Sequence, residues 1–231
     1  MNYEMEPWEL LQKKMIWNQL SFIHNKRVLD FGSGYGISAN HFAANNEVVA
    51  IEPNEEMIAG HIIENQYSQL KGSIDKLKEI ESDSFDIILC HNVLEYVDER
   101  IEILNEFGRI LKSGGTLSVV KHNRNGRVMQ MVVLLNNFEH ANDLLNGKNG
   151  YAQDFGTIHY YENEDITKWC NAFKIKGIYG IRTFWHLQQN QEIQKEKEWQ
   201  EKMFDIETKV SQLDDFKSVA MFHHIILQKI Y

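Results

Sequence analysis

The sequence of 231 residues has little of several features that mark particular classes of protein. It contains only two cysteines, Cys90 and Cys170, and neither has the neighbours that a zinc or iron–sulfur site needs. Isolated cysteines favour a reducing compartment, so we expect a cytoplasmic protein without a metal site. It also has only two prolines and no low-complexity tract, which leaves no candidate for a rigid linker.

Positive charge and long apolar runs are scarce as well. The chain has 24 Lys and Arg against 33 Asp and Glu, a formal net charge of -9. This balance argues against broad, non-specific binding of duplex DNA, although a local basic patch can still form. We find no signal peptide and no apolar run of transmembrane length, so we expect no contact with a membrane. The length suits one α/β domain with a substantial core.

The most informative stretch is residues 27–52, RVLDFGSGYGISANHFAANNEVVAIE. Its apolar runs, glycines and helical spacing predict a strand, a glycine loop, a helix and a second strand that ends at Glu52. Glycines let the backbone turn sharply and approach a ligand closely, and the start of a helix offers free N–H groups. An acid about 20 residues beyond the first glycine suits the hydroxyls of a ribose. The unit therefore predicts a ligand that contains a ribose.

The glycine spacing argues against a dinucleotide. A dinucleotide fingerprint reads G-x-G-x-x-G, whereas here Gly32, Gly34 and Gly36 alternate and Ile37 stands where the third glycine would fall. Asp30, directly before the loop, suits a cationic sulfonium or ammonium better than a pyrophosphate. The pattern resembles the glycine loop of class I S-adenosylmethionine methyltransferases. The alternative is a tight turn that binds nothing. We expect S-adenosylmethionine and its product S-adenosylhomocysteine to bind, and NAD not to bind.

The rest of the chain alternates between the two periodicities, which predicts an α/β fold with a mostly parallel sheet. Further strands are expected at residues 67–71, 85–90, 116–120, 174–181 and 219–227. Helices are expected at residues 6–23, 54–65, 101–111, 164–173 and 188–213, with another beginning at 93–97. Because ligands lie beyond the carboxyl ends of parallel strands, Asp30, Glu52, His91 and the loop after Val120 should surround one crevice.

Residues 122–162 interrupt this alternation. They begin with a short basic loop, continue with an apolar segment at 128–135 that predicts a buried or lid helix, and end with a polar, loop-rich segment at 136–161 that contains several aromatic residues. An insertion of this kind over an active site carries specificity. We expect one domain over residues 1–231, with a lid or substrate-specificity insertion at about 122–162.

Two levels of resemblance to known families follow. The segments VLDFGSGYG, VVAIEPN, FDIILCHNVLEYV and ILKSGGTLSVV resemble class I methyltransferases in general. The segments HNVLEYV, GGTLSVVKHNRNGRVMQMVVLLNNFE, YGIRTF and IETKV resemble the bacterial tRNA 5-carboxymethoxyuridine methyltransferase family. That family methylates the carboxylate of a modified wobble uridine. The resemblance implies a Rossmann-like fold, with a mostly parallel seven-stranded sheet, an antiparallel last strand and helices on both faces.

The chain departs from this family at three places. The family has a basic residue in its first helix that helps to hold the methionine carboxylate, whereas here the position is Gln12, followed by Lys13. Ser33 replaces the second glycine of the loop. Trp185 and His186 stand where the family has His and then Asp. These differences leave the acceptor open, so the chain can also be a relative with another substrate.

From the loop, the strand ends and the resemblance we predict two sets of site residues. The cofactor-binding set is Asp30, Gly32, Ser33, Gly34, Glu52, Pro53, Ser73, Ile74, His91 and Gln12. The substrate-binding set is Arg124, Arg182, His159 and Tyr160, because arginine grips an anion with two bonds and aromatic rings stack on a base. The alternative for the second set is solvated charge and ordinary packing.

The expected reaction is direct, in-line transfer of a methyl group to an acceptor oxygen. A carboxylate is already ionised at neutral pH, so we name no catalytic base. A phenol or amine acceptor would require a base such as His91 or His159. Three hypotheses remain: a methyltransferase that acts on tRNA, a small-molecule O- or N-methyltransferase, and a cofactor-binding protein without catalysis. The sequence leaves the oligomeric state open between a monomer and a homodimer.

Overall fold

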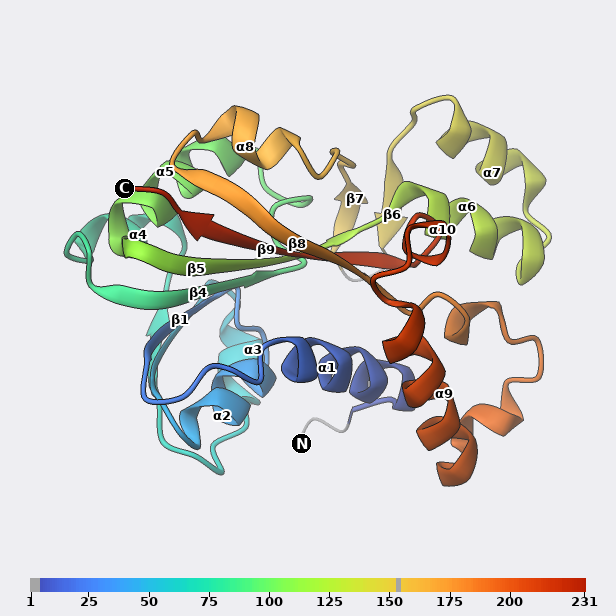
Figure 1. The fold of residues 1–231 in the computed structure, drawn as a ribbon, viewed down its shortest axis with the longest axis horizontal. Coiled ribbons are helices and arrows are strands. Elements are labelled where there is room, and N and C mark those ends of the chain that lie inside the picture. Colours follow the sequence, from blue (N-terminus) through green and yellow to red (C-terminus); the bar gives the residue numbers. More distant parts are fainter. Residues whose placement is uncertain (1–4, 153–154) are drawn as a thin grey trace.

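The computed structural model describes residues 5–152 and 155–231. Its centre is a seven-stranded sheet in the order β3-β2-β1-β4-β5-β9-β8 (Figure 1). The strands are β1 (Arg27–Phe31), β2 (Glu47–Glu52), β3 (Ser68–Lys71), β4 (Phe85–His91), β5 (Leu111–His122), β8 (Phe173–Ile181) and β9 (Phe222–Lys229). β9 pairs antiparallel with both β5 and β8, whereas β3, β2, β1, β4 and β5 are parallel. The predicted α/β class, the mostly parallel sheet and the antiparallel last strand are confirmed.

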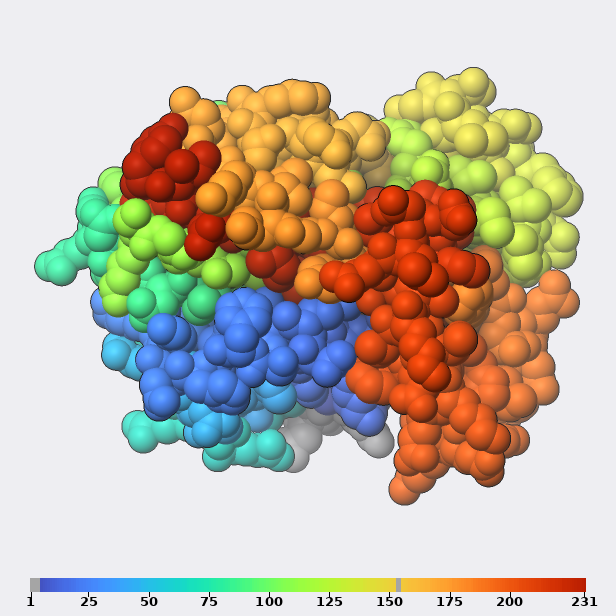
Figure 2. Space-filling view, viewed as in Figure 1, coloured from blue at the N-terminus to red at the C-terminus, as the bar shows by residue number. Residues whose placement is uncertain are grey.

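Helices cover both faces of this sheet, which leaves an apolar core on each side (Figure 1). On one face lie α1 (Pro7–Gln19), α2 (Ile37–Ala43) and α9 (Lys197–Val210), and on the other lie α4 (Ile74–Glu79), α5 (Arg100–Ile110) and α8 (Asp165–Trp169). The central strands β1, β2 and β4 are largely apolar because both of their faces are buried. In Figure 2, α1 and the segment that ends in α9 lie side by side on the surface.

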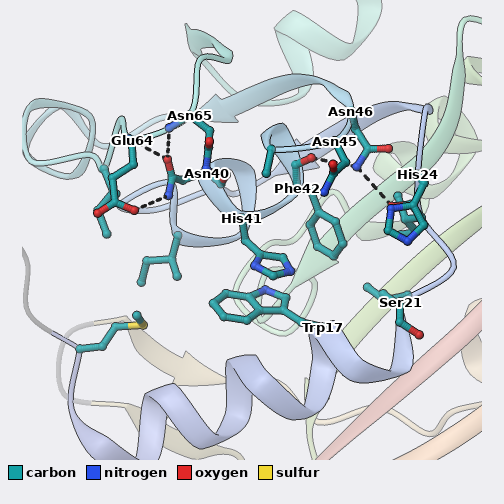
Figure 3. Close-up of a pocket in the computed structure, with 16 residues that line it drawn as sticks. Trp17, Ser21, His24, Asn40, His41, Phe42, Asn45, Asn46, Glu64 and Asn65 are labelled. Atoms are coloured by element: carbon teal, nitrogen blue, oxygen red, sulfur yellow. Dashed lines mark hydrogen bonds between the residues drawn. The ribbon is translucent and has the colours of Figure 1, made fainter.

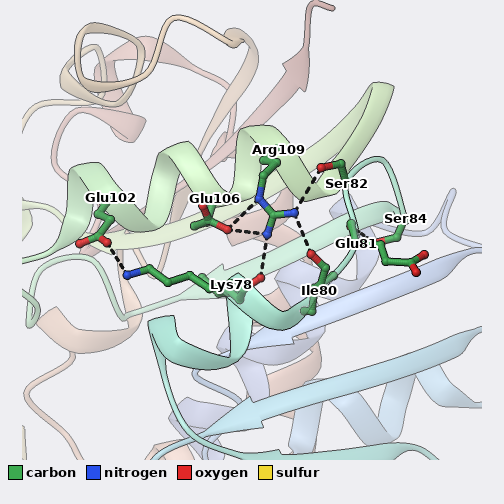
Figure 4. A network of polar contacts seen from close by, with 9 residues as sticks. Lys78, Ile80, Glu81, Ser82, Ser84, Glu102, Glu106 and Arg109 are labelled. Carbon is green, nitrogen blue, oxygen red and sulfur yellow. Dashed lines mark hydrogen bonds and ion pairs between the residues drawn. The ribbon is translucent and has the colours of Figure 1, made fainter.

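The polar contacts of Arg109 fasten the second face (Figure 4). Its guanidinium donates to the carbonyl oxygens of Ile80, at 2.7 Å, and Leu77, at 2.9 Å, and it pairs with Glu106. These bonds join the end of α4 to α5. They lie at the end of the sheet opposite the glycine loop, so we assign them a structural role only.

Several predicted helices are shorter in the structure than in the sequence-based expectation, including those expected at 6–23 and 164–173, which are α1 and α8. The helix expected at 54–65 is α3 (Glu55–Ala59), capped by Asn54 as predicted. Beyond Gly60 the chain leaves the helix because Asn40 Oδ1 accepts hydrogen bonds from the backbone N–H groups of Glu64 and Asn65, both at 2.8 Å. These bonds replace the helical ones.

The helix expected at 188–213 is wrong in its first third. That part contains a short 3-10 turn, η2 (Glu192–Lys195), before α9 begins, and another, η1 (Trp185–Leu187), directly precedes it. Side-chain amides compete here with the helical pattern, because Gln194 donates to the carbonyl of Trp185 and Gln200 donates to that of Gln194. Residues 93–97 form a turn rather than the start of a helix, since α5 begins only at Arg100.

The segment between β5 and α8 lies at the carboxyl end of β5 (Figure 1). It contains α6 (Arg124–Val133), α7 (Phe138–Leu145) and a hairpin of β6 (Gly150–Ala152) and β7 (Gly156–Ile158), so the region expected to be loop-rich is largely ordered. Residues 153–154 of the predicted insertion lie outside the described residues. Gly126 fixes the position of α6, because a Cβ there would lie 2.2 Å from the backbone oxygen of Ala220. The remaining element is α10 (Asp214–Lys217), and no helix in the described part of the chain is long and apolar enough to cross a membrane.

Candidate functional site

The loop after β1 turns tightly over the end of β2. Gly32, Gly34 and Gly36 all have positive φ angles, of 75°, 56° and 73°, which side chains rarely adopt. The N–H groups of Gly32 and Ser33 donate to the carbonyl of Ile51 at 2.9 and 3.1 Å. A Cβ on Gly34 would have only Met57 Sδ nearby, at 3.8 Å, so the space beside this residue is open.

Glu52, at the end of β2, is tied to this loop through both of its carboxylate oxygens. Oε2 accepts from the N–H of Gly34 at 2.8 Å, and Oε1 accepts from the N–H of Asn54 at 2.9 Å. The side chain is buried, with 6% of the residue exposed. Each oxygen keeps acceptor capacity for a further donor. Pro53 follows at the surface, where its ring holds the turn into α3.

Asp30 lies beneath the loop, at the end of β1. It is buried, and its Oδ2 has no hydrogen-bond partner among the described residues. Burial raises the pKa of Asp30 to about 6, and the nearby charge of Lys13 acts in the opposite direction. Lys13, one position beyond the predicted Gln12, is bonded to Ser38 Oγ at 3.2 Å, and burial lowers its pKa. A buried carboxyl group with an unpartnered oxygen can bind a cation.

We expect the binding of S-adenosylmethionine to weaken below pH 6 because of Asp30. A bound cation favours the carboxylate, so the pKa of Asp30 should fall on binding, and affinity should be highest where the carboxylate is already ionised. With a free pKa of about 6, linkage predicts that the dissociation constant rises about fourfold between pH 7.5 and pH 5.5. Calorimetry at several pH values measures it, with Asp30→Asn as the control. The same pH dependence in that variant would exclude Asp30 as the source.

Three further members of the predicted cofactor set, Ser73, Ile74 and His91, lie at the ends of β3 and β4. Ser73 and Ile74 begin α4, close to Glu52, whose carbonyl accepts from the N–H of Gly72 at 3.2 Å. The ring of His91 makes a contact within the sheet, because its Nε2 lies 2.8 Å from Ser118 Oγ. Burial holds the pKa of His91 well below its usual value, with His224 the next cause. This makes His91 a poor base at neutral pH.

A chain of side-chain hydrogen bonds links Gln12, from the predicted cofactor-binding set, to Arg182, from the predicted substrate-binding set. Gln12 Nε2 donates to Asn92 Oδ1 at 3.4 Å, and Asn92 Nδ2 donates to Glu95 Oε1 at 3.2 Å. Arg182 joins the chain through its Nη1, which lies 3.4 Å from Gln12 Oε1. Sequence reasoning missed Asn92 and Glu95. The one available signal was their place directly after β4, at a strand end.

Arg182 is a buried cation, not a surface charge. It has 8% of its surface exposed, its guanidinium lies 4.7 Å from the ring of Trp8, and its Nε has no partner among the described residues. Burial lowers its pKa to about 10, which leaves it charged at neutral pH. Glu207 fixes the chain after it, since its carboxylate accepts from the N–H groups of residues 183–185 at 2.7 to 3.0 Å.

The other predicted substrate residues lie in the insertion. Arg124 donates to the carbonyls of Leu144, at 3.0 Å, and Lys148, at 2.8 Å, so its guanidinium is occupied by the backbone. Tyr160 stacks against Arg124, and its hydroxyl is buried without a partner in the part of the chain that the structure describes. His159 Nδ1 lies 3.0 Å from Asn149 Nδ2. Tyr160 thus lies near Arg127 and Glu95, whose charges act on its pKa, and Arg124 joins α6 to the end of α7.

A separate cavity of about 470 Å³ lies between α1 and α2 (Figure 3). Its centre is a stacked pair, Trp17 and His41, with ring centroids 3.8 Å apart. None of the predicted site residues lines it. Within residues 5–152 and 155–231 we also find no group of three or more histidine, cysteine or acidic side chains arranged to hold a metal ion.

Comparison with known proteins points to one reaction class. Residues 29–119 match the family model described as a methyltransferase domain. The tRNA 5-carboxymethoxyuridine methyltransferase of Escherichia coli K12 is 23% identical over 242 aligned residues, covering 95% of this chain and 88% of the relative. A ubiquinone biosynthesis O-methyltransferase of Coxiella burnetii is 25% identical over 189 residues and 77% of each chain.

Solved structures agree on the fold. An S-adenosylmethionine-dependent methyltransferase from Mesorhizobium loti superposes with a TM-score of 0.59 at 15% identity, over 95% of this chain and all of that one. A possible histamine N-methyltransferase from Thermotoga maritima gives a TM-score of 0.62 at 16% identity, over 97% of this chain and 93% of the other. At this identity the likeness concerns the fold alone.

Proposed function

We propose that this S-adenosylmethionine-dependent methyltransferase methylates a carboxylate oxygen, and that its acceptor is 5-carboxymethoxyuridine at the wobble position of a tRNA. The observation that carries the proposal is the buried, charged guanidinium of Arg182, whose Nε has no hydrogen-bond partner within the described residues. The charges of Glu207 and Glu9 raise its pKa, and an anionic acceptor in direct contact with the guanidinium would offset more of the cost of burying it. The match to the tRNA-modifying relative supports the same acceptor, because it extends over the insertion.

The residues of the crevice fit S-adenosylmethionine. Glu52 offers two oxygens to a ribose, Asp30 offers an unpartnered carboxyl oxygen to a cation, and the open space beside Gly34 admits a ligand close to the backbone. Lys13 and Gln12 on α1 are the groups available for a ligand carboxylate. When bound, S-adenosylmethionine supplies a methyl group carried on a sulfonium, which an ionised carboxylate accepts without losing a proton.

The low basicity of the histidines at this end of the sheet supports a carboxylate acceptor over a phenol or an amine. His91 and His122 face this end of the sheet, and burial lowers the pKa of both, that of His122 to about 3. Neither can remove a proton efficiently at neutral pH. The task left to the protein is to position an anion, for which guanidinium groups suffice.

A small-molecule O-methyltransferase is the second candidate. It is favoured by the similarity to ubiquinone biosynthesis O-methyltransferases and by the formal net charge of -9, which gives little general attraction for RNA. A phenolic acceptor would need a base, and His159, which lies in the insertion beside Asn149, is the candidate. The two candidates therefore differ in whether His159→Ala abolishes turnover.

Nucleoside mass spectrometry of tRNA from a deletion strain tests the proposal. We expect the methyl ester of 5-carboxymethoxyuridine to disappear and the free acid to accumulate, with restoration by the wild-type gene. An unchanged nucleoside profile would reject the tRNA acceptor and favour the small-molecule candidate.

A further inference from the structure

Two arginines on the same helix of the insertion, Arg124 and Arg127, have different surroundings. Arg124 is satisfied by two backbone carbonyls and lies over the ring of Tyr160, so it fastens α7 to α6. Arg127 has one contact on its own helix, from Nη1 to Gln130, and its buried Nε has no partner among the described residues. Of the two, Arg127 is the one with a buried donor that has no partner among the described residues.

Backbone hydrogen bonds bring the start of α6, the helix that carries Arg127, next to Arg182 at the end of β8. The N–H of Met221 donates to the carbonyl of Arg182 at 3.2 Å, and the carbonyl of Met221 accepts from the N–H of Asn123, the cap of α6, at 3.0 Å. The start of α6 and the end of β8 are thus joined through one residue of the chain leading into β9.

A buried polar atom without a hydrogen-bond partner among the described residues lies near that junction. The ring of Phe222 lies 4.6 Å from that of His122 and 5.5 Å from the guanidinium of Arg182, between centroids or Cζ. His122 Nε2 is bonded to Tyr96 Oη at 3.0 Å, whereas its Nδ1 is buried and unpartnered among the described residues. The charges of Arg127 and Arg182 both lower the pKa of His122, after burial, which agrees with both guanidinium groups lying near it.

We propose that Arg127 and Arg182 form a two-arginine clamp for the anionic group of the acceptor, with the hydroxyl of Tyr160 as a third donor. The three unpartnered donors, Arg127 Nε, Arg182 Nε and Tyr160 Oη, are buried, and a buried donor without an acceptor costs free energy that an anion recovers. Glu95 completes the setting. It lies close enough to Tyr160 to raise the pKa of that hydroxyl, it is 1% exposed, and its Oε2 is free among the described residues.

The clamp rests on the proposed function for the identity of the anion, but it can be tested without turnover. The probe is phenoxyacetate, which carries the same –O–CH₂–COO⁻ group on an aryl ring, and the neutral comparison is phenoxyacetamide. Both are titrated by calorimetry into the full chain loaded with S-adenosylhomocysteine. We expect the wild type to bind the carboxylate roughly tenfold or more tightly than the amide, the gain expected for a charge-assisted pair.

Matched variants on one helix then assign the effect. Arg127→Gln should remove most of the preference for the carboxylate, and Arg127→Lys, which keeps the charge without the fork, should retain part of it. Arg124→Gln is the control, and it should lower the melting temperature but keep the preference. Binding of S-adenosylhomocysteine by each variant shows that it is folded.

The outcomes separate this inference from the proposed function. A wild type that binds neither probe at millimolar concentration, or that binds both equally, overturns the clamp, as does an Arg127→Gln variant with an unchanged preference. If the preference depends on Arg127 but tRNA bearing 5-carboxymethoxyuridine is not methylated, the clamp stands and the tRNA acceptor falls. If the tRNA is methylated and Arg127→Gln leaves KM and the preference unchanged, the function stands and the clamp falls.

Discussion

Replacing Glu52 by alanine should weaken the binding of S-adenosylmethionine by about 1–3 kcal/mol, the usual cost of losing hydrogen bonds to a charged group. The carboxylate is the acceptor that a ribose diol needs, and it also holds the glycine loop through the N–H groups of Gly34 and Asn54. Both effects act in the same direction. Calorimetry with S-adenosylmethionine and S-adenosylhomocysteine gives the two dissociation constants.

A neighbouring acid provides the control for Glu52. Glu56 is exposed on α3, so Glu56→Ala changes the net charge by the same amount without touching the loop. The melting temperature of the ligand-free Glu52→Ala protein reports whether the fold survives, which we expect because the residue lies at a strand end. An unchanged dissociation constant in Glu52→Ala would remove Glu52 from the site.

Replacing Arg182 by lysine should lower the rate of methyl transfer to the acceptor by about tenfold or more, equivalent to about 1.4 kcal/mol of transition-state stabilisation. Lysine keeps the positive charge but loses the planar fork that grips a carboxylate with two bonds. The left-handed backbone at this position, with φ of 61°, is no worse for lysine than for arginine. Initial rates on tRNA that carries 5-carboxymethoxyuridine measure the effect.

The dissociation constant of the cofactor must be measured beside that rate. Arg182 touches Gln12, so a small change in cofactor affinity is expected, whereas the main loss should appear in KM or kcat for the acceptor. Since Arg182 is buried, thermal unfolding of the variant shows whether the loss is local. Full activity in Arg182→Lys would show that the guanidinium fork does not hold the acceptor.

The centre of the sheet could be predicted from the sequence because β1, β2 and β4 are buried on both faces. The run FDIILC, which is β4 up to Cys90, is too short for a buried helix and is bounded by polar residues. It therefore predicts a buried strand. The ends of β1 and β2 brought Asp30 and Glu52 into view for the same reason. Parallel strands place their carboxyl ends at one edge, so residues far apart in the chain could be expected to meet there.

Hydrogen bonds between side chains and the backbone could not be predicted from the sequence. They account for most of the differences between the expected and the observed structure. Asn40 ends the turn after α3 by accepting two N–H groups, and nothing in the periodicity of residues 54–65 indicates it. Glu207 caps the chain after β8 from a helix 22 to 24 residues further on. Arg124 and Arg127 look equivalent in the sequence, and only the position of α7 shows which of them the backbone already occupies.

Methyl transfer to tRNA followed by mild alkaline treatment tests the central claim most directly. Purified protein is incubated with tRNA bearing 5-carboxymethoxyuridine and with S-adenosylmethionine labelled in its methyl group. The account predicts label in the tRNA that alkali releases as methanol, because a methyl ester hydrolyses under conditions in which methyl ethers and methylated amines persist. Label that resists alkali, or no label in the tRNA, would contradict it.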